Sequence, residues 1–154
     1  MFRRILCALF VMVLFTGCSA TSAGSAVKDI QSVDDLTALL QSHMSGSDVQ
    51  TKNVLVTLLR LDPDSIVDAK AVFEKGETGK LAIVILAKDD EAALEAGDRL
   101  NYYLSTLQNS AAQYNTDALE MIRNGYIYTR DNVTVLVISD DIDAVKAELA
   151  EYFS

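Results

Sequence analysis

Two pairs of aspartates are the side chains in this sequence whose types and spacing most clearly suggest chemistry. Asp89-Asp90 and Asp140-Asp141 each follow an apolar segment, and Asp143 lies close to the second pair. Such carboxylates could hold a cation, but calcium takes six to eight oxygens, and neither run has the alternate spacing or the glycine of a calcium loop. Aspartate is also favoured at helix N-termini. We therefore predict that both pairs cap helices, and we expect no metal or cofactor.

The residues needed for catalysis are scarce. The chain has one histidine, His43, and its two cysteines are Cys7 and Cys18. No G-x-S-x-G, H-E-x-x-H or glycine-rich phosphate loop occurs in the sequence. Glycoside cleavage needs a pair of carboxylates, but the chain has 22 acidic residues, and their number alone does not indicate which two would form such a pair. We therefore expect no enzyme, and we expect His43 to face solvent at the end of a helix.

The N-terminus combines basic residues, an apolar run and a cysteine. Two arginines precede the run from Ile5 to Phe15, and Thr16 and Gly17 separate this run from Cys18. A basic start, an apolar core and a small-residue exit are typical of a secretion signal. About a dozen apolar residues are too few to span a bilayer of roughly 30 Å. The segment resembles a bacterial lipoprotein signal, in which Cys18 is lipidated.

This resemblance implies a location outside the cytoplasm. Residues 1–17 would be the signal peptide, Cys18 would become the mature N-terminus, and residues 18–28 would form a flexible tether. The two or three acyl chains of a lipoprotein, palmitate among them, would hold the protein on the outer face of the cell membrane, since one chain alone binds reversibly. An ordinary signal peptide and an uncleaved N-terminal anchor are the alternatives.

The charge of the chain excludes one class of partner. The formal net charge is −9, and it becomes −11 once the two arginines of the signal leave with it. A nucleic-acid binder needs a cationic surface, so we expect no nucleic-acid partner. Residues 29–154 are enough for one domain with a core of its own.

The hydrophobic periodicity predicts an alternation of helices and strands. Segment 49–61 fits either a buried strand or a helix, and we favour a helix because one helical stripe persists through it. The remaining predicted helices are 32–44, a long helix that begins within 88–90 and runs to 114, 116–124, and a last helix that begins at 140–141 and runs to 152. The predicted strands are 66–74, 81–87, 126–130 and 133–139.

A pattern that occurs twice in the sequence suggests how these elements assemble. The runs AIVILAKDDEAAL (82–94) and VLVISDDIDAV (135–145) share an apolar strand, a pair of aspartates and an amphipathic helix, and each follows another strand and a turn. Two strand–strand–helix units predict an α+β two-layer sandwich, with a four-stranded, largely antiparallel sheet and one or two N-terminal helices. We expect the two apolar strands to be central, the other two at the edges, and the helices on one face.

The same features resemble a known family. The signal, the turn Asp62-Pro63-Asp64-Ser65, the run LAIVILAKDD, the long helix and the run VTVLVISDD are similar to small lipoproteins of Gram-positive, clostridia-like bacteria. These are grouped as domain of unknown function 4358. The resemblance implies a fold and a compartment, and it brings no activity with it.

We therefore expect a lipid-anchored binding or interaction module at the cell envelope, with an envelope protein as a possible partner. The exposed sheet face or the tyrosines could supply its surface, namely Tyr102, Tyr103, Tyr114, Tyr126 and Tyr128. The alternative is an accessory subunit of an envelope complex, with strand 126–130 pairing with a partner strand. A hydrolytic enzyme ranks below both.

Overall fold

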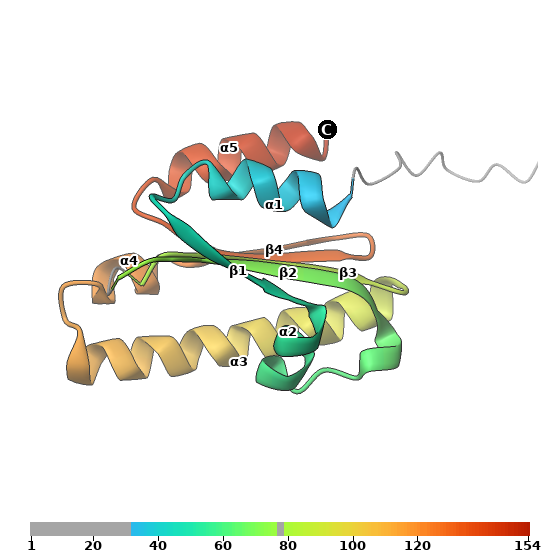
Figure 1. Cartoon of the computed structure of the whole chain (residues 1–154), viewed down its shortest axis with the longest axis horizontal. Helices are drawn as coiled ribbons and strands as arrows, with labels where there is room; N and C mark the ends of the chain where they lie inside the picture. Colours follow the sequence, from blue (N-terminus) through green and yellow to red (C-terminus); the bar gives the residue numbers. More distant parts are fainter. Residues whose placement is uncertain (1–31, 77–78) are drawn as a thin grey trace, which may run out of the picture.

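A five-stranded sheet forms the centre of the computed structural model, which describes residues 32–76 and 79–154 (Figure 1). The predicted signal peptide, Cys18 and the tether lie outside the described residues. Each strand is antiparallel to its neighbours, and the strand order is β1-β2-β3-β5-β4. The strands are β1 (Ser47–Thr51), β2 (Ile66–Glu74), β3 (Leu81–Ala87), β4 (Tyr126–Arg130) and β5 (Val133–Ile138).

Helices cover both faces of this sheet. Figure 1 shows α1 and α5 above the sheet and α2, α3 and α4 below it. Their bounds are α1 (Val33–Gln41), α2 (Lys52–Leu59), α3 (Asp90–Tyr114), α4 (Leu119–Arg123) and α5 (Ile142–Tyr152), with a short 3-10 helix at Pro63–Ser65. Among the described residues, no helix has both the length and the apolar character needed to cross a membrane.

Two separate cores follow from this arrangement. The upper core joins α1 and α5 to the sheet through residues such as Leu36 and Leu149. The lower core joins α2, α3 and α4 to it through residues such as Leu55, Leu100 and Ile122. Every residue of β5 is buried, because helices cover its side chains on both faces.

The expected two-layer sandwich is therefore wrong in its layering, while the α+β class and the antiparallel sheet are confirmed. The helices after the two apolar strands, α3 and α5, lie on opposite faces and not on one. The physical reason lies in β3 and β5 themselves. Strands that are apolar on both sides need a cover on both sides. Within residues 32–76 and 79–154, helices cover both faces of the sheet, so neither face is left broadly open as a binding surface.

The strand count differs because segment 49–61 is divided. Val49–Thr51 belongs to β1, and the helix α2 begins only at Lys52. β1 is an edge strand with no fully buried residue. Its sequence, SDVQT, therefore lacks the alternation of apolar and polar residues that predicts a strand. Because β1 pairs with β2, β2 is an inner strand rather than the predicted edge, whereas β4 lies at the predicted edge.

Local contacts agree with the predicted first helix, with the predicted turn at 62–65 and with the predicted strand at 66–74. The Ser32 side chain caps α1 by accepting a hydrogen bond from the Asp35 amide. In the predicted turn, the Asp62 carboxylate accepts a hydrogen bond from the Asp64 amide. Strand 66–74 forms as predicted, with an irregular register after Ile66 that leaves Val67 exposed. Tyr114, the last residue of α3, has a side chain that is 84% exposed.

Candidate functional site

The two aspartate pairs lie at opposite ends of the sheet. β3 and β5 are adjacent and antiparallel, with Leu81 opposite Ile138 and Leu86 opposite Val133. The pair that follows β3 is therefore more than about 20 Å from the pair that follows β5, at roughly 3.3 Å per residue. The two pairs cannot share one cation. Among residues 32–76 and 79–154, no three His, Cys, Asp or Glu side chains lie close enough to hold a metal ion together.

Only the first pair acts as a helix cap. Asp89 accepts a hydrogen bond of 2.8 Å from the Ala92 amide at the start of α3, as predicted. Asp141 occupies the position before α5, but its side chain makes no capping bond, and its own amide donates to the Ser139 hydroxyl at 3.2 Å. The predicted cap is therefore wrong for the second pair.

Asp140 instead forms an ion pair with Lys80. The Asp140 Oδ2 atom lies 2.9 Å from Lys80 Nζ, and Glu74 Oε1 lies 3.8 Å from the same ammonium group. The hydrogen bond with Lys80 holds the pKa of Asp140 below its ordinary value and raises the pKa of Lys80. These residues link the β2–β3 hairpin to the β5–α5 turn, so their role is structural.

The single histidine also has a structural partner. His43 Nε2 lies 3.0 Å from Glu148 Oε2, so His43 joins the loop after α1 to α5. The prediction that His43 faces solvent is therefore wrong, because its side chain is only 13% exposed. The neighbouring Ser42 hydroxyl donates to the Leu39 carbonyl and not to His43. A shallow hollow of about 550 Å³ beside them is lined by acidic Glu148 and Glu151.

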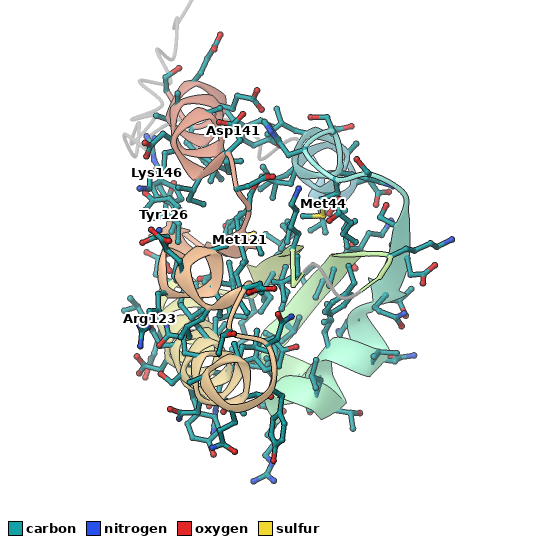
Figure 2. All side chains as sticks on the ribbon, turned by 90° about the vertical axis from the view of Figure 1, so that its left-hand side faces the viewer. Met44, Met121, Arg123, Tyr126, Asp141 and Lys146 are labelled. Carbon is teal, nitrogen blue, oxygen red and sulfur yellow. The ribbon has the colours of Figure 1, made fainter. Side chains whose placement is uncertain are left out.

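The predicted tyrosine surface is divided between two layers. Tyr126 and Tyr128 pack with the upper core, and Tyr128 stacks against Phe153 with 5.2 Å between ring centroids. Lys146 of α5 lies 5.3 Å from the ring of Tyr126, and Figure 2 shows the two side by side on one flank. Tyr102 and Tyr103 belong to α3, on the other face of the sheet. The tyrosines therefore form no common surface.

A groove between the end of α2 and the middle of α3 gathers two of the predicted tyrosines with two arginines. We call it the α2–α3 groove, and its volume is about 330 Å³. Its lining consists of Leu58, Leu59, Arg60, Arg99, Tyr102, Tyr103 and Thr106.

Helical spacing positions the α3 side of the α2–α3 groove. Arg99, Tyr102, Tyr103 and Thr106 are separated by three, one and three residues, which places them on one face of a helix. The other side comes from the end of α2. There Arg60 adopts a left-handed conformation, with φ 55° and ψ 45°, and its amide donates to the Val56 carbonyl.

The two arginines differ in their partners. Arg99 Nη2 lies 3.6 Å from Glu95 Oε1, one turn earlier on α3, so its charge is partly offset. Arg60 makes no ion pair or side-chain hydrogen bond with any residue that the structure describes. Burial raises the pKa of Tyr103, so its phenol stays protonated and remains a hydrogen-bond donor.

The sequence indicates the two tyrosines as surface candidates but neither arginine. The i, i+3, i+4 and i+7 spacing from Arg99 to Thr106 is a visible signal, but of these four residues only Tyr103 also belongs to the apolar stripe of the helix. Arg60 gave no local signal, because only the folded chain brings it to α3. The α2–α3 groove combines a free guanidinium, aromatic rings and apolar side chains, which can bind a ligand by charge and by stacking.

The fold thus defines an α+β domain with one antiparallel sheet between two layers of helices. A family model described as Domain of unknown function (DUF4358) matches residues 42–139. The chain belongs to this family, which confirms the resemblance found in the sequence. The searches of curated proteins and of solved structures gave no match.

Proposed function

We propose that this protein is a lipid-anchored binding module on the outer face of the cell membrane, and that the α2–α3 groove is its ligand-binding site. The observation that carries the binding role is the groove itself, where the exposed side chain of Tyr102 lies beside Arg60, which has no ion pair or side-chain hydrogen bond with any described residue. An exposed aromatic beside a free cation is typical of recognition surfaces, in which Tyr and Arg are enriched.

The N-terminal sequence supports the location. The basic start, the apolar run and the Thr16-Gly17-Cys18 exit have the order of a lipoprotein signal. Lipidation at Cys18 would leave residues 19–31 between the lipid and the first described residue, Ser32. Thirteen residues reach at most about 45 Å when fully extended, so the domain would stay close to the membrane.

The location is tested by the chemistry of Cys18. In the native organism, we expect mass spectrometry to find the mature chain beginning at an acylated Cys18. A Cys18→Ala variant should leave the membrane fraction, or keep its full-length N-terminus unprocessed. An unmodified chain beginning at Met1 in the wild-type protein would show that the proposed location is wrong.

The binding role is tested by crosslinking in cells. A photoreactive phenylalanine in place of Tyr102 should trap a ligand or partner of the α2–α3 groove. The same residue in place of Tyr114 is the matched control, since Tyr114 is exposed on the same helix outside the lining of the groove. Equal crosslinking at both positions, or none at position 102, would contradict a binding site in the α2–α3 groove.

An accessory role in an envelope complex is the second candidate. It is favoured by β4, which ends the sheet and pairs with β5 alone among the described strands. An exposed strand edge can accept a strand from another protein. A photoreactive residue at position 126 should then give a discrete protein adduct, whereas adducts only at position 102 would favour the binding module.

A catalytic role has less support than either. The single histidine is paired with Glu148 on the upper face of the sheet, whereas the α2–α3 groove lies on the lower face. We therefore propose recognition without a chemical step.

A further inference from the structure

We propose that the α2–α3 groove binds a small organic anion that carries one carboxylate or phosphate on an aromatic body, and that Arg60 holds the anionic group. This inference rests on the proposed binding role and names the chemistry of the ligand.

The charge distribution is the first argument. Six basic side chains form ion pairs within the described residues, namely Lys70, Lys75, Lys80, Arg99, Arg130 and Lys146. A seventh, Lys52, donates to the Ile66 carbonyl. Among the described residues, Arg60, Lys88 and Arg123 have no such partner, and of these three only Arg60 lines the α2–α3 groove. An unpaired guanidinium in a groove is ready to take an anion, and its planar fork fits carboxylate and phosphate alike.

The backbone at Arg60 is the second argument. Its φ of 55° lies in the left-handed region, which a side chain with a Cβ adopts at a cost and which glycine adopts freely. Glycine is the common residue where a helix ends in this conformation. The backbone at this position therefore does not favour an arginine, and binding of an anion would give the arginine a role there.

The walls of the α2–α3 groove specify the rest of the ligand. The Tyr102 side chain is 77% exposed and Leu58 is 45% exposed, so one ring and one aliphatic side chain are presented to solvent. Tyr103 adds a second, partly buried ring whose hydroxyl has no hydrogen-bond partner within the described residues. An aromatic ligand could stack on these surfaces and accept a hydrogen bond from Tyr103.

The size and net charge of the site limit the ligand to a small molecule with a single anionic group. A volume of about 330 Å³ lies at the lower end of the range for small-molecule sites. Arg99 is the second cation, but Glu95 at 3.6 Å offsets its charge. One free positive charge therefore matches one anionic group, and a polyanion would meet the repulsion of a strongly acidic chain.

Binding can be measured on the full chain in lipid nanodiscs, with empty nanodiscs as the reference for partitioning of the probes. The probes are phenylacetate, phenyl phosphate, the neutral benzyl alcohol, acetate and inorganic phosphate. We expect phenylacetate or phenyl phosphate to bind at least tenfold more tightly than the other three, and the stronger of the two identifies the anionic group. Equal binding of benzyl alcohol would overturn the proposal.

The variant Arg60→Gly separates binding from folding. It should weaken binding of the preferred probe at least tenfold while raising the melting temperature, because glycine suits the left-handed backbone. Arg123→Ala is the matched control, since Arg123 also lacks an ion pair with any described residue but lies on α4 outside the lining of the groove, and binding by this variant should equal that of the wild type. Unchanged binding in Arg60→Gly would overturn the proposal.

The outcomes also distinguish this inference from the proposed function. Crosslinking at position 102 without binding of either aromatic anion would keep the groove as a site and reject the ligand class. Binding of an aromatic anion by a protein with an unmodified Cys18 would keep the ligand class and reject the lipid anchor.

Discussion

The carboxylate of Asp140 lies 2.9 Å from the ammonium group of Lys80, across the end of the two central strands. The contact follows from the register, because Leu81 is opposite Ile138 and these residues stand next to Lys80 and Ser139. Lys80 is 18% exposed and Asp140 is 66% exposed, so solvent screens the pair from one side only.

The first prediction concerns this pair and pH. The pKa of Asp140 is lowered in the folded state by the hydrogen bond with Lys80. A lowered pKa stabilises the folded state above the unfolded-state pKa, and this contribution disappears as the pH falls through the folded-state pKa. Asp140→Asn should therefore cost at most about 1 kcal/mol of unfolding free energy at pH 7, because the carboxylate is largely exposed.

Urea unfolding of wild type and Asp140→Asn from pH 7 to pH 2 would check this prediction. The two curves should converge at the acid end. Asp143→Asn is the control, since Asp143 is 93% exposed and its change should stay within about 0.5 kcal/mol. A difference between wild type and Asp140→Asn that grows with acidity would contradict the assignment.

The second prediction concerns the left-handed residue at the end of α2. Arg60→Gly should raise the free energy of unfolding by about 0.5–1 kcal/mol, because glycine adopts a positive φ without the Cβ penalty. Calorimetry should show a rise in melting temperature of a few degrees for a domain of this size. Asp131→Gly is the comparison, since Asp131 has φ 51° and aspartate tolerates this region better. A larger gain at Asp131 would count against this explanation.

The third prediction concerns two glycines with different surroundings. A Cβ at Gly125 would lie 2.8 Å from Leu104 Cδ1 and 3.1 Å from the Ile122 carbonyl oxygen, so Gly125→Ala should cost about 1–3 kcal/mol. A Cβ at Gly97, inside α3, would make ordinary contacts at 3.4 Å or more. Gly97→Ala should therefore be neutral or stabilising by up to about 1 kcal/mol. Chemical denaturation gives the change in unfolding free energy for each variant, and equal changes in the two variants would contradict the prediction.

The fourth prediction tests the two cores. Leu36 of α1 and Leu100 of α3 are both fully buried, on opposite faces of the sheet. Each change to alanine should cost about 2–5 kcal/mol, because the surrounding side chains fill the cavity only partly. Leu94→Ala is the control, since Leu94 is 64% exposed and should lose less than about 0.5 kcal/mol. A small effect of Leu36→Ala would mean that α1 is not part of the folded core.

Much of the local structure could be predicted because its signals are local. The apolar runs of β3 and β5, the alternation in β2 and the stripe of α3 each appear within a few residues. The caps at Ser32 and Asp89 are likewise set by residues three positions apart. The edge strand β1 had no such signal, because its extended conformation is stabilised by backbone pairing with β2 and not by burial of its own side chains.

The sequence by itself determined the N-terminal motif that ends at Cys18, the acidic charge, the α+β class and most helix and strand positions, since these depend on composition and short-range spacing. Only the tertiary structure decided that α3 and α5 cover opposite faces and that Arg60 meets Tyr102 in one groove. The reason is physical. Periodicity shows which face of an element is apolar, but the partner of that face is chosen by packing between residues far apart in the chain.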